Sequence, residues 1–199
     1  MKHWSGILLV AVFICVLSAP AFARDEVLVG GPIEHGGYGG PSLKVGPVMD
    51  KARFFIGGYG GWYINHTFMI GGGGYGLINE VKAPVSGKQG EKLYFEMGYG
   101  GLVLEYVNKS HRLVHFTINT LLGGGGIQYR SSEDWPFNYK DDSFFIVEPC
   151  ICVELNITTH FRMGLGVGYR YIDGVDLPGI TDEDLTGVVA NFDLKFGSF

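Results

Sequence analysis

The sequence has few cysteines, no excess of positive charge and, beyond its first residues, no long apolar run. Lysine and arginine together number 15, against 20 aspartates and glutamates. Nucleic-acid-binding proteins usually present a basic surface because their ligand is a polyanion, so this balance argues against such a partner. No segment beyond residue 23 approaches the roughly 18 consecutive apolar residues of a membrane-spanning helix, which excludes a helical membrane protein.

Cysteine is scarce, with three residues in the chain, of which Cys15 falls in the N-terminal apolar segment. Cys150 and Cys152 are two residues apart, and on a strand they would project from the same face, a poor geometry for a disulfide between them. Structural zinc sites usually have four ligands, and no second pair of cysteines is present. We therefore expect two free thiols in the core and no cofactor.

The apolar run lies at the N-terminus, where Lys2 and His3 precede residues 7–17 and small residues follow up to Ala23. This pattern predicts a secretory signal peptide over residues 1–23. The alternative, a transmembrane anchor, would need ~20 apolar residues, and this run is too short. Removing the segment takes away one lysine and leaves 14 basic against 20 acidic residues, a formal charge of −6.

Glycine is abundant, with 33 of 199 residues, more than twice its usual share of ~7%. It is densest from Gly57 to Gly76, where nine of twenty residues are glycine and aromatic residues lie among them. Two apolar segments flank Asn65-His66 there, which predicts a β-hairpin. A phosphate-binding loop is not expected, because neither a helix nor a Lys-Ser/Thr pair follows Gly76.

From Tyr38 onward apolar and polar residues alternate with a period close to two, the pattern of strands with one apolar face. After a lead-in over residues 24–37, this alternation predicts eight strands and no helix, with a β-bulge at Pro149 in the sixth strand. The predicted strands span roughly 38–48, 53–64, 67–79, 92–107, 111–129, 142–159, 160–172 and 185–197.

The connections between these strands alternate in length. The second, fourth and sixth strands are followed by tight turns, such as Asn65-His66. The third, fifth and seventh strands are followed by long loops, over residues 80–91, 130–141 and 173–184. In an up-and-down barrel this alternation places the long loops at one end and both ends of the barrel chain at the other. The predicted fold is all-β, an eight-stranded antiparallel up-and-down barrel over residues 38–199.

Alternation alone leaves open whether the apolar face points into the barrel or out of it. A soluble lipocalin-like barrel would point it inward around an apolar ligand, and a transmembrane barrel would point it outward toward lipid. The polar face of residues 162–170 favours the second arrangement, because its glycines leave room for charged side chains in a narrow eight-stranded interior. By the same rule the face with Leu93 and Phe95 would point outward and Glu96 inward.

The predicted chain has eight strands, short turns, long loops and a terminal aromatic residue, Phe199. This plan resembles small bacterial outer-membrane β-barrels of the OmpA/OmpX type. The block GGYGGWYINHTFMIGGGGYGL also resembles an uncharacterised family of Gly-rich outer-membrane barrels. The resemblance implies a transmembrane β-barrel in contact with outer-membrane lipid. The termini and the short turns would then lie on the periplasmic side, and the long loops on the extracellular side. We expect a monomer, and because eight strands leave no channel, we expect no open pore.

The predicted inward face carries several charges, which suggest how the interior is filled. Buried charges must be paired and hydrogen-bonded, so these side chains are expected to form ion pairs that plug the barrel. The predicted cluster consists of Glu96, Glu154, Arg162, Arg170, Asp193 and Lys195.

The long loops are the best candidates for contact with an extracellular partner. Trp135, Phe137 and Tyr139 form an aromatic trio in one of them, and exposed aromatic residues are typical of interfaces. The loops at 130–142 and 173–184 are rich in carboxylates, which we interpret as solvated, with divalent-ion binding as the alternative.

A structural or surface-interaction role follows from this plan, such as membrane integrity, adhesion or recognition. One alternative is a lipid-modifying enzyme, which would need a His-Ser-acid group on the lipid-facing wall. His115 shares a face with Thr117 rather than with a serine, so an enzyme is not expected. The other alternative is the soluble, lipocalin-like binder of an apolar ligand.

Overall fold

The computed structural model describes residues 33–86, 92–131 and 138–199, and of residues 138–140 it describes the backbone alone. Within these ranges the chain forms nine antiparallel strands and one helical turn. The elements are β1 (His35–Val48), β2 (Lys51–Ile64), β3 (Phe68–Leu77), β4 (Val81–Ser86), β5 (Lys92–Asn108), β6 (Val114–Ser131), β7 (Asn138–Thr158), β8 (Phe161–Asp173), α2 (Asp182–Leu185) and β9 (Gly187–Ser198).

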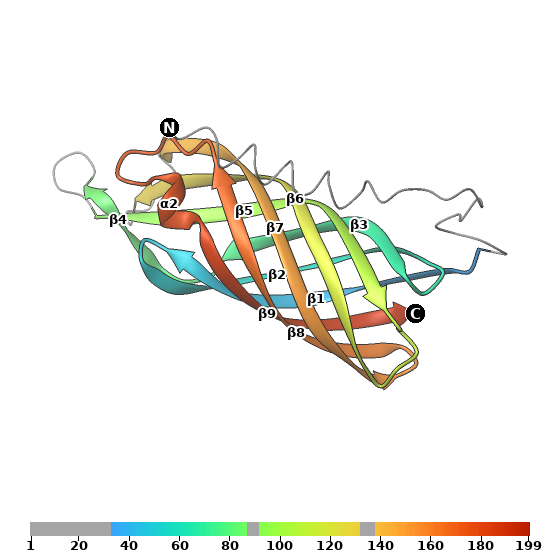
Figure 1. The fold of residues 1–199 in the computed structure, drawn as a ribbon. Helices are drawn as coiled ribbons and strands as arrows, with labels where there is room; N and C mark the ends of the chain where they lie inside the picture. Colours follow the sequence, from blue (N-terminus) through green and yellow to red (C-terminus); the bar gives the residue numbers. More distant parts are fainter. Residues whose placement is uncertain (1–32, 87–91, 132–137) are drawn as a thin grey trace, which may run out of the picture. The chain divides into compact units, whose positions relative to one another are not determined.

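Eight of these strands close into a barrel (Figure 1). Neighbours in sequence pair with one another, β1 pairs with β9, and β3 pairs directly with β5, which completes the ring. The eight-stranded antiparallel up-and-down barrel predicted from the sequence is thereby confirmed. β1 begins at His35, within the predicted lead-in.

The two ends of the barrel differ. The turn end carries the β2–β3, β5–β6 and β7–β8 turns, together with the start of β1 and the end of β9, where Gly37 pairs with Ser198. The loop end carries β4 and α2, which lie opposite the C-terminus in Figure 1. The division into a turn end and a loop end matches the predicted alternation of short and long connections.

β4 and α2 were not predicted. The pairing of β3 with β5 ends at Gly76 opposite Gly98. The part of β5 that extends beyond this pair toward the loop end pairs with β4, where Val81 lies opposite Phe95. The segment is short and contains Pro84, which is tolerated because β4 has a free edge. α2 is a single turn, too short to produce a helical period, and no helix in the described residues is long and apolar enough to cross a membrane.

Two tight turns require left-handed backbone conformations. Asn65 and His66 have φ values of 50° and 52°, and Met49 and Asp50 have φ values of 51° and 60°. Two consecutive residues with positive φ match the twist of flanking strands in a two-residue hairpin, and asparagine adopts this conformation more readily than most residues. The predicted turn at Asn65-His66 is therefore confirmed, and a second one joins β1 to β2.

The apolar faces of β6, β8 and β9 point outward, as predicted, with Val114, Leu165 and Val188 more than half exposed. The charged faces of these strands point into the barrel. The prediction for the first half of β5 was wrong, because Leu93 and Phe95 are buried and Glu96 faces outward. The barrel interior is apolar at the loop end, so the inward residues there are apolar as well.

Two smaller predictions also differ from the structure. Pro149 causes no bulge, since the register of β7 against β6 and β8 is the same before and after it. The glycines occupy both faces of the sheet, not only the polar one. Gly60 and Gly72 face outward, whereas a Cβ on the inward-facing Gly46 would lie 2.9 Å from a terminal nitrogen of Arg170.

Candidate functional site

The interior of the barrel contains an ion-pair network centred on Lys195 of β9. Its Nζ donates to Glu105 Oε1 of β5 at 2.6 Å and also to Glu154 of β7. All three side chains are almost completely buried. Each carboxylate thus has the same ammonium group as its counter-ion, across a barrel interior that excludes solvent.

Tyrosine, threonine and histidine side chains surround these two carboxylates. Tyr38 OH donates to Glu105 Oε1 at 2.6 Å, and Tyr59 OH donates to Glu105 Oε2 at 3.0 Å. On the other side, Thr117 Oγ1 donates to Glu154 at 3.4 Å, and His115 Nε2 lies 3.3 Å from Glu154 Oε2. His115 therefore serves the interior network and does not face the outer wall.

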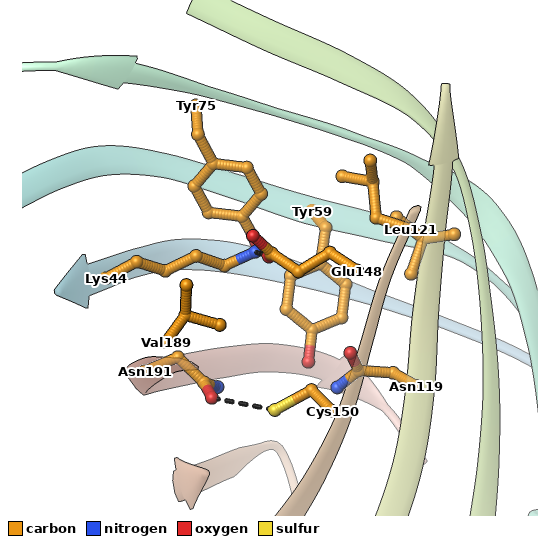
Figure 2. A pocket seen from close by; sticks show the side chains of 10 residues that line it. Lys44, Tyr59, Tyr75, Asn119, Leu121, Glu148, Cys150, Val189 and Asn191 are labelled. Carbon is orange, nitrogen blue, oxygen red and sulfur yellow. Dashed lines mark hydrogen bonds and ion pairs between the residues drawn. The ribbon is translucent and has the colours of Figure 1, made fainter. Parts of the chain in front are cut away.

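A second ion pair, Lys44 with Glu148, joins β1 to β7 nearer the loop end (Figure 2). Lys44 Nζ lies 3.5 Å from the centre of the Tyr75 ring, so the ammonium also gains a cation–π contact. Tyr99 OH donates to the other Glu148 oxygen at 3.3 Å. The pair thus ties opposite walls of the barrel together.

Between the two ion pairs lies a polar group built from β7, β9 and β1. Asn191 Nδ2 donates to Asp193 Oδ2 at 2.6 Å, and Ser42 Oγ donates to Asp193 Oδ1 at 2.5 Å. Cys150 Sγ lies 2.9 Å from Asn191 Oδ1, the contact drawn in Figure 2, and 3.5 Å from Cys152 Sγ. Both thiols are free, as expected from the sequence.

The two interior arginines lie outside the ion-pair network. At the loop end Arg170 donates to the backbone oxygens of Leu185 at 3.0 Å and Pro47 at 2.7 Å. At the turn end Arg162 lies 3.8 Å from the centre of the Phe199 ring and 3.5 Å from the backbone oxygen of Ser110. Both are buried, and backbone oxygens and aromatic rings surround them in place of the predicted carboxylates.

The loop end of the interior is closed by an apolar plug. Leu177, Ile180 and Leu185 of the β8–β9 connection are buried in the core of the barrel. Tyr129 OH donates to the Pro178 oxygen at 2.6 Å, and Asp182 Oδ1 accepts from the Val175 backbone at 2.8 Å. The connection predicted to be a solvated loop is therefore a folded cap, and the Asp182 carboxylate accepts a hydrogen bond within it.

A small cavity lies in the barrel interior beside the Lys44–Glu148 pair. The cavity between Lys44, Tyr59 and Cys150 has a volume of about 10 Å³, which suits a single water molecule at most. Among the residues described, no three His, Cys, Asp or Glu side chains are placed to hold a metal ion together.

Glu96 and the predicted aromatic trio are not found among the interior side chains that the structure describes. Glu96, predicted as interior, lies on the outer wall at the loop end, with Arg130 Nε 3.0 Å from its Oε1 and Gln128 donating to its Oε2 at 2.7 Å. Trp135 and Phe137 lie outside the described residues, as does the side chain of Tyr139. Asp193, Glu154 and the other predicted charges lie in the interior.

Three of the side chains in these interior ion pairs were not predicted from the sequence: Lys44, Glu105 and Glu148. Glu105 stands in the apolar run LVLEYV, and Lys44 stands in SLKVG. A single charge between apolar neighbours on a predicted strand was the available signal, because such a residue must point to the side away from lipid.

The outer surface shows aromatic residues in two bands that flank an aliphatic zone. Near the turn end Phe161 stacks on Phe196, with ring centres 4.7 Å apart, and Phe68 lies 5.4 Å from Tyr106. Nearer the loop end the exposed aromatic residues are Phe54, Phe145, Tyr169 and Tyr171. Aromatic girdles of this kind mark the two membrane interfaces of transmembrane barrels.

Comparison with known proteins gives a structural match. No protein-family model and no curated protein matches this sequence. The Neisserial surface protein A, NspA, superposes with a TM-score of 0.51 at 12% identity, covering 84% of this chain and 97% of NspA. The chain has the fold of a small outer-membrane β-barrel.

Two further solved barrels are similar at lower scores. The attachment invasion locus protein Ail of Yersinia pestis gives a TM-score of 0.47 at 10% identity, covering 82% of this chain and 97% of Ail. The outer membrane protein OprG of Pseudomonas aeruginosa gives 0.46 at 13% identity, covering 82% of this chain and 94% of OprG.

Proposed function

We propose that this barrel spans a bacterial outer membrane and serves a structural or surface-interaction role, with its loop end facing outward from the cell. The observation that carries the proposal is the inversion of polarity across the wall. Leu165, Val153 and Val188 expose their side chains on the outside, whereas Lys195 and Glu154 are buried inside. A barrel in water would gain nothing from this arrangement, whereas lipid favours it.

Membrane fractionation combined with gel mobility before and after heating tests this proposal. We expect the protein in the outer-membrane fraction, migrating faster when unheated because the folded barrel resists detergent. A protein that remains in the soluble fraction with the same mobility before and after heating would contradict the proposal. The predicted signal peptide at 1–23 lies outside the described residues, and the N-terminal sequence of the recovered protein would test it.

The proposed role does not include conduction. Two ion pairs, Lys195 with Glu105 and Lys44 with Glu148, cross the interior, and the Leu177–Leu185 cap closes the loop end. Reconstituted protein should therefore show no channel events in a planar lipid bilayer. Interaction would take place at the loop end, through connections that include the aromatic trio at 135–139.

The two alternatives have less support. A lipid-modifying enzyme would need its histidine on the outer wall, and His115 is buried inside beside Glu154. A soluble binder of an apolar ligand would need an apolar cavity, and the small cavity in the interior is lined by the polar side chains of Lys44, Glu148 and Asn191. We therefore propose a non-enzymatic, monomeric barrel in contact with outer-membrane lipid.

A further inference from the structure

The β5–β6 turn presents two positively charged side chains at the outside of the barrel. Lys109 and Arg112 lie in this turn, and both residues are exposed. Among the residues that the structure describes, neither the Lys109 ammonium nor the Arg112 guanidinium forms an ion pair or a hydrogen bond. The turn therefore carries two cations that the barrel leaves available to a ligand.

The backbone of this turn is held in place by its neighbours. Asn156 Nδ2 of β7 donates to the backbone oxygens of Ser110 and Arg112, each at 2.8 Å. His115 Nδ1 lies 3.1 Å from the same Arg112 oxygen, and the Arg112 N–H donates to the Lys109 oxygen at 2.9 Å. The two cations thus project from a fixed scaffold, as a binding group requires.

The two ends of the barrel differ in charge. Among the described residues of the turn end, Glu34 is the one exposed acidic side chain, and its Oε2 lies 2.5 Å from His66 Nε2. The loop end has many exposed carboxylates, such as Asp50, Asp141 and Glu183. The summed field of these charges attracts an anion to the turn end and repels it from the loop end.

Apolar side chains follow the cations directly. Leu113 is 67% exposed and Val114 57% exposed, at the start of β6. On the β5 side Asn108 Nδ2 donates at 3.3 Å to the hydroxyl of Tyr106, which belongs to the aromatic band of the turn end. Because such a band marks the membrane interface, the cations lie at the level of lipid headgroups and the apolar residues at the level of the chains.

We propose that the β5–β6 turn binds one anionic phospholipid, with Lys109 and Arg112 on its phosphate and Leu113 beside its acyl chains. Lysine and arginine are the usual phosphate ligands of proteins, and arginine can bind two phosphate oxygens at once. The inference rests on the proposed outer-membrane barrel, in which the turn end lies in the periplasmic leaflet. A soluble phosphate compound would use the cations alone, whereas a phospholipid uses the cations and the apolar residues together.

The test titrates the purified protein, folded in neutral detergent micelles, with phosphatidylglycerol or with phosphatidylcholine, and native mass spectrometry counts the lipid molecules bound. We expect one tightly bound phosphatidylglycerol per barrel and weaker binding of phosphatidylcholine, whose choline group cancels the charge of its phosphate. Added salt should weaken the binding of phosphatidylglycerol, because the two cations are exposed. Glycerol phosphate, which has the anionic group without the chains, should bind more weakly than the lipid.

The matched variants remove two exposed cations from either end of the barrel. Lys109→Gln and Arg112→Gln should each weaken the binding of phosphatidylglycerol about fivefold, and together about 25-fold, since a basic residue near a membrane surface contributes ~1 kcal/mol. Lys51→Gln with Lys82→Gln, at the loop end, should bind as wild type does. Gel mobility without heating confirms that every variant is folded.

Four results would overturn the proposal: equal binding of the two lipids, unchanged binding in the turn-end double variant, an equal loss in the loop-end double variant, or glycerol phosphate binding as tightly as the lipid. The last result would indicate a site for a soluble phosphate compound. A protein that fractionates as soluble would contradict the proposed function itself, whereas a membrane barrel with any of these four results would contradict this inference alone.

Discussion

At the scale of single residues, the stability of this protein depends on charged side chains that are buried inside the barrel. Lys195 is the clearest case, since it is paired with both Glu105 and Glu154. A buried ion pair adds little compared with an apolar replacement, but a buried charge that loses its partner is costly. The network is therefore sensitive to the loss of any one member.

Replacing Lys195 by methionine should lower the free energy of unfolding by about 3–5 kcal/mol, because two buried carboxylates lose their counter-ion. Urea titration in detergent micelles, followed by tryptophan fluorescence and gel mobility, measures this change. Lys51→Met, at an exposed position on β2, is the control and should unfold as wild type does. A wild-type midpoint for Lys195→Met would show that the carboxylates do not depend on Lys195.

Arg162→Ala should have a smaller effect. Arg162 contacts the Phe199 ring and the Ser110 oxygen instead of a carboxylate, so its removal costs a cation–π contact and a long hydrogen bond, about 1–3 kcal/mol. Arg112→Ala, at an exposed position of the β5–β6 turn, should have no effect. A loss from Arg162→Ala as large as that from Lys195→Met would indicate an acidic partner for Arg162.

At the scale of elements, glycine sets how closely the strands of the β2–β3 hairpin approach. A Cβ added at Gly61 would lie 2.3 Å from the Ile70 oxygen and 2.5 Å from the Gly71 Cα. These contacts are with backbone, which cannot move aside without separating the strands. At Gly76, by contrast, no atom lies within 4 Å of an added Cβ.

Gly61→Ala and Gly76→Ala are therefore a matched pair within one hairpin. Gly61→Ala should destabilise the barrel by about 1–3 kcal/mol, the usual cost of overpacking, whereas Gly76→Ala should be tolerated. The urea midpoints of the two variants give the comparison directly. Equal midpoints would mean that chain flexibility, and not the close approach of β2 and β3, accounts for the glycines.

At the scale of the whole molecule, the outer surface distinguishes a transmembrane barrel from a soluble one. Leu165 lies on β8 midway between Phe161 at the turn end and Tyr169 nearer the loop end, and it is 65% exposed. This position corresponds to the middle of the proposed lipid-facing zone.

Leu165→Arg should destabilise the barrel folded in lipid vesicles by about 2–4 kcal/mol, the cost of arginine at the midplane of a barrel wall. Tyr171→Arg, at the interface, should destabilise it by only ~0–1 kcal/mol. Folding titrations in vesicles compare the two. If the barrel were soluble, Leu165→Arg would be neutral and would improve solubility.

The sequence by itself determined the all-β class, eight barrel strands and the arrangement of short turns and long connections, because a period of two and turn residues are local properties of the chain. It also determined the outward face of β6, β8 and β9, where apolar residues alternate regularly along the strand. β4 and α2 were missed because each is too short to show a period.

Only the tertiary structure decided which charges meet. Lys195 pairs with Glu105 across 90 residues of sequence, and Lys44 pairs with Glu148 across 104, separations that follow from barrel closure and strand stagger. The same closure reversed the expected position of Glu96, since the apolar cap at the loop end fills the interior beside it. Local alternation tells which residues share a face, and only the closed barrel tells what that face meets.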